Sequence, residues 1–146
     1  MPCGPSGVKA VIDTNVLVSA LLWRGNPSII FDAVLDGRLE LCLTEELLSE
    51  LADVLRRPRI AKHVAERRLD VRWSCDFIRE RSFIIAAAVP LDVPELRDRN
   101  DLPVLTAAKA SAADLIITGD KDLLSLESFA RIPIVEPAEA VKLLPL

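Results

Sequence analysis

The stretch of residues 8–18 constrains the fold more than any other part of this 146-residue chain. Residues 8–12 (VKAVI) form a short, mostly apolar run rich in β-branched side chains, which is typical of a strand buried on both faces of a sheet. Asp13, Thr14 and Asn15 interrupt this run, and apolar residues then resume at helical spacing. Ligands of open parallel sheets collect at the carboxyl ends of the strands, so Asp13 is directed toward a candidate site. Taken alone, the pattern also fits Asp13 or Thr14 as the cap of the next helix.

The composition is that of a compact folded domain. Half of the residues (51%) are hydrophobic and the formal net charge is −4, which excludes an intrinsically disordered chain. The length allows one substantial core, so we expect a single domain over residues 8–146 after a disordered tail at residues 1–7. No apolar stretch approaches the roughly 18 residues that a membrane-spanning helix needs. The three cysteines lack metal-ligand spacing, and their small, odd number predicts a cytoplasmic location.

Histidine is scarce in this sequence. His63 is the single histidine, which excludes ribonuclease chemistry with two histidines and argues against a serine–histidine triad. Any hydrolysis by this chain must therefore depend mainly on carboxylates.

Strand and helix signals alternate along the chain, which predicts an α/β fold around a mostly parallel sheet of about five short strands. The clearest strand signals cover residues 8–12, 39–43, 114–117 and 132–135. Residues 59–85 are predicted as one long basic helical region, although residues 83–89 also fit a strand. Parallel strands joined by helices bring their carboxyl ends to one edge of the sheet, where polar residues would meet.

Acidic residues recur at the ends of predicted strands and the starts of predicted helices. Asp13 and Asp120 follow strands, and Asp101 opens a helix, where it also fits a simple N-cap. Glu50 lies at the edge of the apolar stripe of the helix after Thr44, a position that favours a solvated acid but also allows it to face a crevice. Four acids in one crevice would raise one another's pKa, and a divalent cation makes such a cluster tolerable. All-oxygen ligation favours Mg²⁺ or Mn²⁺.

The order of these acids resembles that of PIN-domain ribonucleases. Four segments carry the resemblance, which covers nearly the whole chain from Val8 onward: 11–15 (VIDTN), 49–51 (SEL), 97–101 (RDRND) and 118–122 (TGDKD). The resemblance is strongest to the VapC-like toxin components of toxin–antitoxin pairs. It implies a three-layer α/β/α, Rossmann-like PIN fold.

By this resemblance, four acids bind the metal and are catalytic: Asp13, Glu50, Asp101 and Asp120. Asn15 and Thr118 match supporting polar positions, and Asp122 is a candidate for a further ligand. Asp98 competes with Asp101 for the third acidic position, and Asp101 is preferred because it directly precedes the predicted helix.

The activity implied by the resemblance is hydrolysis of RNA phosphodiester bonds by an Mg²⁺- or Mn²⁺-dependent endoribonuclease. In that mechanism one ion lowers the pKa of a bound water, and a second stabilises the leaving oxygen. Toxins of this kind are inhibited by a small antitoxin and often form homodimers. The implied partners are therefore RNA, in single-stranded regions, a cognate antitoxin and a second copy of the chain.

Basic residues are concentrated in one segment. Nine basic and four acidic residues fall between Arg56 and Arg81, so this segment carries a charge of +5 and the remainder of the chain −9. Such a segment can hold phosphates, and its start offers Arg56, Arg57, Arg59 and Lys62 as RNA contacts. An ordinary solvated helical face explains the charge equally well.

Other functions fit parts of the sequence. A haloacid-dehalogenase-type phosphatase also begins with an apolar strand that ends in Asp, but it requires a second Asp where this chain has Asn15. A phospho-accepting receiver domain needs paired acids before the first-strand Asp, which this chain lacks. A further alternative is a catalytically inactive PIN-like module, in which the acids no longer cooperate in catalysis and the protein only binds RNA or a protein partner. Metal-dependent RNA cleavage separates the nuclease from this module, and release of phosphate from a monoester would indicate the phosphatase.

Overall fold

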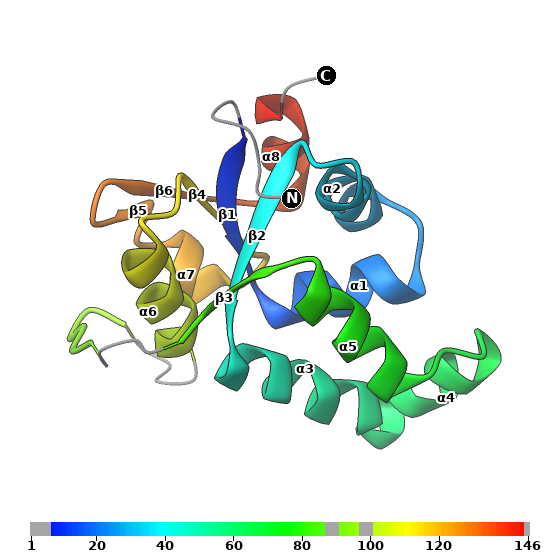
Figure 1. The fold of residues 1–146 in the computed structure, drawn as a ribbon. Coiled ribbons are helices and arrows are strands. Elements are labelled where there is room, and N and C mark those ends of the chain that lie inside the picture. The colour runs from blue at the N-terminus through cyan, green and yellow to red at the C-terminus, as the bar shows by residue number, and fades with distance from the viewer. Residues whose placement is uncertain (1–6, 87–90, 97–100, 145–146) are drawn as a thin grey trace.

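The computed structural model describes residues 7–86, 91–96 and 101–144. In these residues six strands form one sheet, in the order β3-β2-β1-β4-β6-β5 (Figure 1). The strands are β1 (Val8–Ile12), β2 (Leu39–Thr44), β3 (Phe83–Ile85), β4 (Leu115–Ile117), β5 (Ser128–Phe129) and β6 (Ile132–Val135). Neighbouring strands pair in parallel except β5 and β6, which are antiparallel. The predicted α/β class and mostly parallel sheet are confirmed, and the two-residue β5 is an addition.

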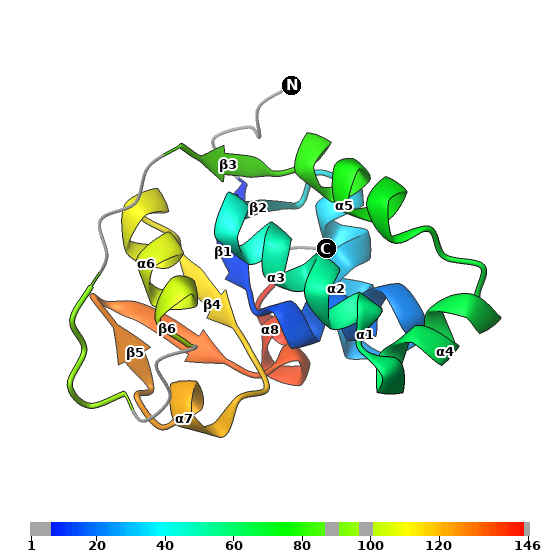
Figure 2. The ribbon, with the colours of Figure 1, turned by 90° about the horizontal axis from the view of Figure 1, so that it is seen from below.

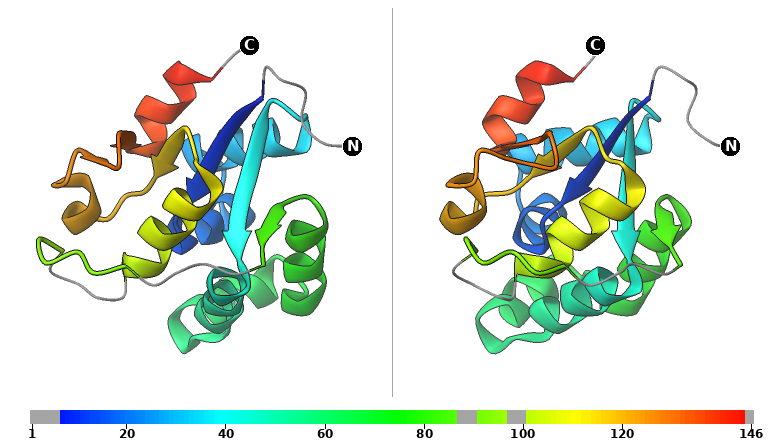
Figure 3. Two further views of the ribbon diagram at one scale, coloured as in Figure 1. Left: turned by 60° about the vertical axis from the view of Figure 1, so that its left-hand side comes forward. Right: turned by 90° about the vertical axis from the view of Figure 1, so that its left-hand side faces the viewer.

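Helices cover both faces of the sheet. They are α1 (Thr14–Leu22), α2 (Asn26–Leu35), α3 (Glu45–Arg56), α4 (Pro58–Glu66), α5 (Val71–Glu80), α6 (Leu102–Ser111), α7 (Lys121–Leu124) and α8 (Pro137–Leu143). The helix α6 packs against one face, where it contacts β1, β2, β3 and β4. On the opposite face lie α1 and α2, with α8 packed beside α2 (Figure 3). The arrangement is the predicted α/β/α layering.

Residues 10–12 of β1 and all of β4 are buried on both faces of the sheet, as their unbroken apolar sequences predict. Their register pairs Ala10 with Leu115 and Ile12 with Ile117, so the two strands end at the same edge of the sheet. Each of these four residues is at most 4% exposed. On α6, Ala108 is fully buried, and its small side chain lets the helix approach the sheet closely. Packing of β1 against β4 thus brings the polar residues that follow both strands together.

The basic region at residues 59–85 differs from the single helical region that its periodicity predicts. The helix α4 ends at Glu66, and Arg68 adopts a left-handed φ of 54° that interrupts helical geometry. Asp70 then caps α5 by accepting a hydrogen bond from the N–H of Trp73 (2.8 Å). The end of the region forms β3, in agreement with the strand alternative for its described residues.

Two other sequence predictions concern the ends and the environment of the chain. The disordered tail was predicted for residues 1–7, of which residues 1–6 lie outside the described part. Among the residues that the structure describes, no helix combines the length and the apolar character needed to cross a membrane.

Candidate metal-binding site

A pocket of about 300 Å³ opens at the carboxyl edge of the sheet, where β1 enters α1. Figure 2 shows this edge, with α3 crossing in front of the strands. The four acids predicted as metal ligands all line the pocket: Asp13, Glu50, Asp101 and Asp120. The other lining residues are Thr14, Asn15, Val54 and Arg57. Acids that are far apart in the sequence therefore share one small space.

Asp13 connects the ends of the two central strands. Its backbone N–H donates to the carbonyl of Ile117 (2.9 Å), and its Oδ2 accepts a hydrogen bond from the Thr118 hydroxyl (2.7 Å). The backbone of Asp13 occupies the N-cap position of α1, yet within the described residues its side chain makes no capping hydrogen bond. The capping alternative therefore describes the backbone of Asp13, while its carboxylate is held by Thr118.

Thr118 joins Asp13 to Asp120. Its side chain is fully buried, and its hydroxyl oxygen also accepts a hydrogen bond from the N–H of Asp120 (2.9 Å). A single hydroxyl thus orients the carboxylate that follows β1 and the backbone that follows β4. The family resemblance implies a supporting role for Thr118, and a hydroxyl that contacts both acidic segments is able to orient them.

Replacing Thr118 with Val is expected to weaken Mn²⁺ binding by about 10- to 100-fold, the usual cost of losing a hydrogen bond that orients a metal ligand. The same change should lower the free energy of unfolding by about 1–3 kcal/mol, because the buried carboxylate of Asp13 and the partly buried N–H of Asp120 lose their partner. Thr118→Ser keeps the hydroxyl and serves as the control. Calorimetric Mn²⁺ titration and thermal unfolding measure both effects. Equal Mn²⁺ affinity in the Val and Ser variants would show that the hydroxyl has no orienting role.

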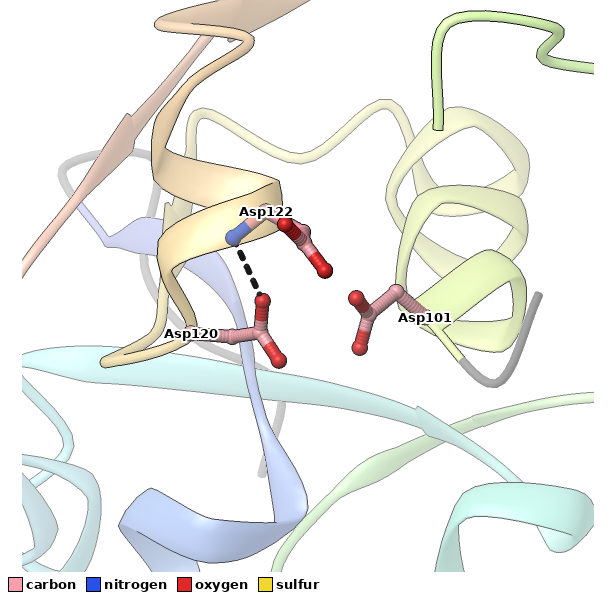
Figure 4. Close-up of side chains that lie close together, drawn as sticks. All are labelled: Asp101, Asp120 and Asp122. Atoms are coloured by element: carbon pink, nitrogen blue, oxygen red, sulfur yellow. Dashed lines mark hydrogen bonds between the residues drawn. The ribbon is translucent and has the colours of Figure 1, made fainter. Parts of the chain in front are cut away.

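Three carboxylates form the tightest acidic group among the described residues. One oxygen from each of Asp101, Asp120 and Asp122 lies within 4.8 Å of the others. Figure 4 shows the three side chains directed toward one another, Asp101 from the start of α6 and the other two from the start of α7. The Oδ1 of Asp120 accepts hydrogen bonds from the N–H groups of Asp122 (2.7 Å) and Leu123 (3.3 Å), so capping of α7 fixes this carboxylate. Both bonds use one oxygen, and the second oxygen can serve a cation.

Glu50 enters the pocket from α3. It is partly buried, and its Oε2 accepts a hydrogen bond from the Thr14 hydroxyl (2.8 Å). The alternative of a solvated acid at the edge of the helix stripe is therefore wrong for this residue. The role of Thr14 as the partner of Glu50 was missed by the sequence reasoning. Its position between Asp13 and Asn15 was the available signal, but the contact spans 36 residues and depends on how α3 packs against α1.

The pocket raises the pKa of two carboxyls. Burial is the main cause for both Asp13 and Glu50, and neighbouring negative charges add to it, from Asp120 on Asp13 and from Asp13 on Glu50. Hydrogen bonds from Thr118 and Thr14 act in the opposite direction, as does the positive charge of Arg57 on Glu50. An oxygen-rich site that disfavours its own ionised form suits a divalent cation.

The raised pKa of Asp13 predicts a pH dependence of the stability of the metal-free protein. Between the ordinary pKa of aspartate and the raised pKa of Asp13, this carboxyl is protonated in the folded chain but ionised in the unfolded chain. Its contribution to the free energy of unfolding is therefore full below the ordinary pKa and is lost as the pH rises through the folded pKa. Asp13→Asn removes that loss. In EDTA, as the pH rises above the ordinary aspartate pKa of about 4, the free energy of unfolding of the variant should increase relative to that of the wild type, and the difference should level off above the raised pKa of Asp13. A difference independent of pH would contradict the raised pKa.

The predicted RNA contacts do not share one location. Arg57 lines the pocket that contains Asp13, Glu50, Asp101 and Asp120, which we call the acid pocket. Arg56, one residue earlier, lines a different pocket between α3 and α5. Arg59 and Lys62 are exposed on α4. Of the two candidates for the third acid, Asp101 lines the acid pocket and Asp98 lies outside the described residues.

Comparison with known proteins places this chain in a family. Residues 9–122 match the family model described as PIN domain. The chain is also 32% identical over 120 residues to the uncharacterized protein MJ1680 of Methanocaldococcus jannaschii, in an alignment that covers 82% of this chain and 75% of that protein.

Proposed function

This chain belongs to the PIN domain family, and on that basis we propose that it is an Mg²⁺- or Mn²⁺-dependent endoribonuclease that hydrolyses RNA phosphodiester bonds. PIN domains are in general metal-dependent nucleases. The observation that carries the proposal is the group of carboxylate oxygens from Asp101, Asp120 and Asp122. Asp101 and Asp120 of this group also line the pocket that Asp13 and Glu50 reach. The donor set contains only oxygen, which fits Mg²⁺ or Mn²⁺ better than zinc.

Each side chain of the site has a role in the proposed reaction. Asp13, Asp101 and Asp120 would hold the cation, with Asp122 as a further ligand, and Glu50 would accept a proton from the attacking water or complete the ligand set. When bound, a divalent cation supplies a water of lowered pKa and stabilises negative charge on the phosphate.

The surrounding residues would position the RNA. The guanidinium of Arg57 is suited to a phosphate oxygen at the mouth of the pocket, since guanidinium groups match phosphate geometry. Asn15 is exposed at the pocket and can orient a ligand or a water by hydrogen bonding. Thr118 and Thr14 keep Asp13 and Glu50 in place before the substrate arrives.

The biological setting is part of the proposal. We propose a VapC-like toxin, because the four acidic segments resemble those of that group. That resemblance also implies a homodimer and inhibition by a cognate antitoxin, and the few cysteines of the chain fit a cytoplasmic location. We further propose that residues 8–146 form one PIN-like domain. Coexpression with the product of a small adjacent gene tests the toxin assignment, because an antitoxin should restore growth that the chain alone arrests.

Removal of the metal tests the proposed activity. A single-stranded RNA should be cut internally in Mn²⁺ or Mg²⁺, EDTA should abolish the cleavage, and excess Mn²⁺ should restore it, because the carboxylates need the cation to activate water. Gel analysis of end-labelled RNA measures the reaction, and a phosphomonoester serves as the alternative substrate. Unchanged cleavage in EDTA would contradict the metal mechanism. RNA binding without cleavage would indicate the binding module instead.

A further inference from the structure

A second pocket, of about 750 Å³, lies at the opposite end of α1 from the acids. Trp23, directly after α1, provides its aromatic side chain, and the charged lining residues are Arg24, Asp32 and Arg67. We propose that this Trp23 pocket binds an unpaired base of the RNA substrate, a few nucleotides from the bond cleaved at the acid pocket. The proposal rests on the ribonuclease function proposed above and adds a substrate subsite to it.

Two helices connect the acid pocket to the Trp23 pocket. The helix α1 begins at Thr14, which lines the acid pocket, and ends directly before Trp23. The helix α4 begins after Arg57, which lines the acid pocket, and ends directly before Arg67, which lines the Trp23 pocket. Each helix has nine residues, so the pockets are separated by roughly 14 Å along either helix axis. Both helices lie on the same side of the molecule (Figures 1 and 2).

The side chains around Trp23 suit a nucleobase. The indole is 39% exposed, and the ring of His63 meets it edge-on at 5.2 Å between centroids. The guanidinium carbon of Arg67 lies 5.7 Å from the indole centroid, near the outer limit of about 6 Å for a cation–π contact. A base can replace this weak contact by stacking on the indole, which leaves the exposed Arg67 to pair with a phosphate. Stacking of this kind requires a base that is not paired in a duplex.

Charge favours RNA over a protein as the occupant. His63 and Arg67 belong to the segment that carries +5 in a chain of net charge −4, and the charged lining residues of the pocket sum to +1. A phosphodiester strand that is neutralised by Arg57 at the acid pocket would meet further positive charge as it follows α4. The pocket thus offers stacking and phosphate contacts together, the combination used for single strands.

The chain contains an internal control for this proposal in its second tryptophan. Trp73 is 62% exposed and belongs to the same basic segment, but it lies on α5, where it stacks on Phe77 at 5.0 Å between centroids. The sequence has two tryptophans in all, so each can be observed alone by fluorescence. Trp73→Phe leaves Trp23 as the reporter, and Trp23→Phe leaves Trp73.

Both single-tryptophan proteins are titrated with a single-stranded oligoribonucleotide of mixed sequence in EDTA, which prevents cleavage. We expect saturable quenching in Trp73→Phe and little change in Trp23→Phe. Quenching confined to Trp23→Phe would place the base at Trp73, and an unchanged signal in both proteins would show that RNA does not enter the pocket. Either result overturns the proposal.

Steady-state cleavage kinetics give an independent measurement. Trp23→Leu should raise KM by roughly 5- to 150-fold, the fold-change that corresponds to the stacking of one base, with a smaller effect on kcat. Trp23→Phe should restore most of the KM, and Trp73→Leu should leave it near the wild-type value. RNA cleavage combined with no quenching of Trp23 fluorescence and no change of KM in Trp23→Leu overturns the Trp23 subsite but not the ribonuclease function. Quenching at Trp23 without cleavage contradicts the ribonuclease function alone.

Discussion

Asp13→Asn is expected to reduce metal-dependent RNA cleavage by more than about 100-fold while the fold remains intact. Loss of a group that only orients a ligand costs about 10- to 100-fold, so loss of a charged ligand should exceed that range. The amide has nearly the same size as the carboxylate, and its oxygen can still accept the hydrogen bond of Thr118. Cleavage rates on a single-stranded RNA in saturating Mn²⁺, together with circular dichroism, measure both parts of the prediction.

A second aspartate provides the matched control for Asp13. Asp36 follows α2, is exposed, and pairs with Arg38 at 3.2 Å. Exposed ion pairs contribute about 0–1 kcal/mol, so Asp36→Asn should leave both the cleavage rate and the stability nearly unchanged. An Asp13→Asn protein that cleaves RNA at the wild-type rate would contradict the assignment of Asp13 to the site.

At Asp120, two substitutions separate metal binding from helix capping. Asp120→Ala removes both the charge and the oxygen that caps α7, whereas Asp120→Asn removes the charge and keeps a good N-cap residue. Cleavage should fall by more than about 100-fold in both variants, because each removes a ligand charge and a direct ligand matters more than an orienting group. The free energy of unfolding of the metal-free protein should fall by about 0.5–2 kcal/mol in Asp120→Ala alone.

The comparison of the two Asp120 variants has a clear opposite outcome. If Asp120→Asn retains wild-type cleavage and Asp120→Ala does not, the carboxylate of Asp120 acts only as a helix cap. Of the three grouped acids, only Asp101 and Asp122 could then be metal ligands. Thermal unfolding in EDTA and RNA cleavage in Mn²⁺ are both needed, since stability alone does not separate the two roles.

The features of this fold that depend on local sequence were predictable. The strand at residues 8–12 is mostly apolar and rich in β-branched side chains, and the burial of its last three residues, 10–12, on both faces of the sheet follows from that composition. Thr44 has a side chain that favours the N-cap position, and its hydroxyl accepts a hydrogen bond from the N–H of Leu47 at the start of α3. Because parallel strands have their carboxyl ends at one edge of a sheet, Asp13 and Asp120 were expected to lie near each other, and both line the same pocket.

Features that depend on where helices end and on long-range contacts were not predictable. Arg56 is the last residue of α3, whereas Arg57 has an extended backbone between α3 and α4, and the two side chains line different pockets. The hydrogen bond between Thr14 and Glu50 likewise requires α3 to pack against α1. The break at Arg68 depends on a left-handed backbone conformation that hydrophobic periodicity does not report.

The resemblance to PIN ribonucleases indicated which acids belong to the site, a choice that residue types and spacing alone left open. Residue types and spacing identified several acids, each with a structural alternative such as capping or solvation. The ordered set of four segments selected among those alternatives, and the family match over residues 9–122 agrees with that selection at the level of the fold family. Substitution of Asp13 and of Asp120 tests the role of each of these two acids.

The most direct measurement of the central claim is anomalous X-ray scattering from crystals of the protein soaked in Mn²⁺. We predict an anomalous peak in the acid pocket, within coordination distance of carboxylate oxygens of Asp101 and Asp120 and of at least one of Asp13 and Asp122. The same soak of Asp13→Asn crystals should show a weaker peak. Saturating Mn²⁺ that gives no peak in this pocket, or a peak only at exposed acids elsewhere, would show that the carboxylates do not share a cation.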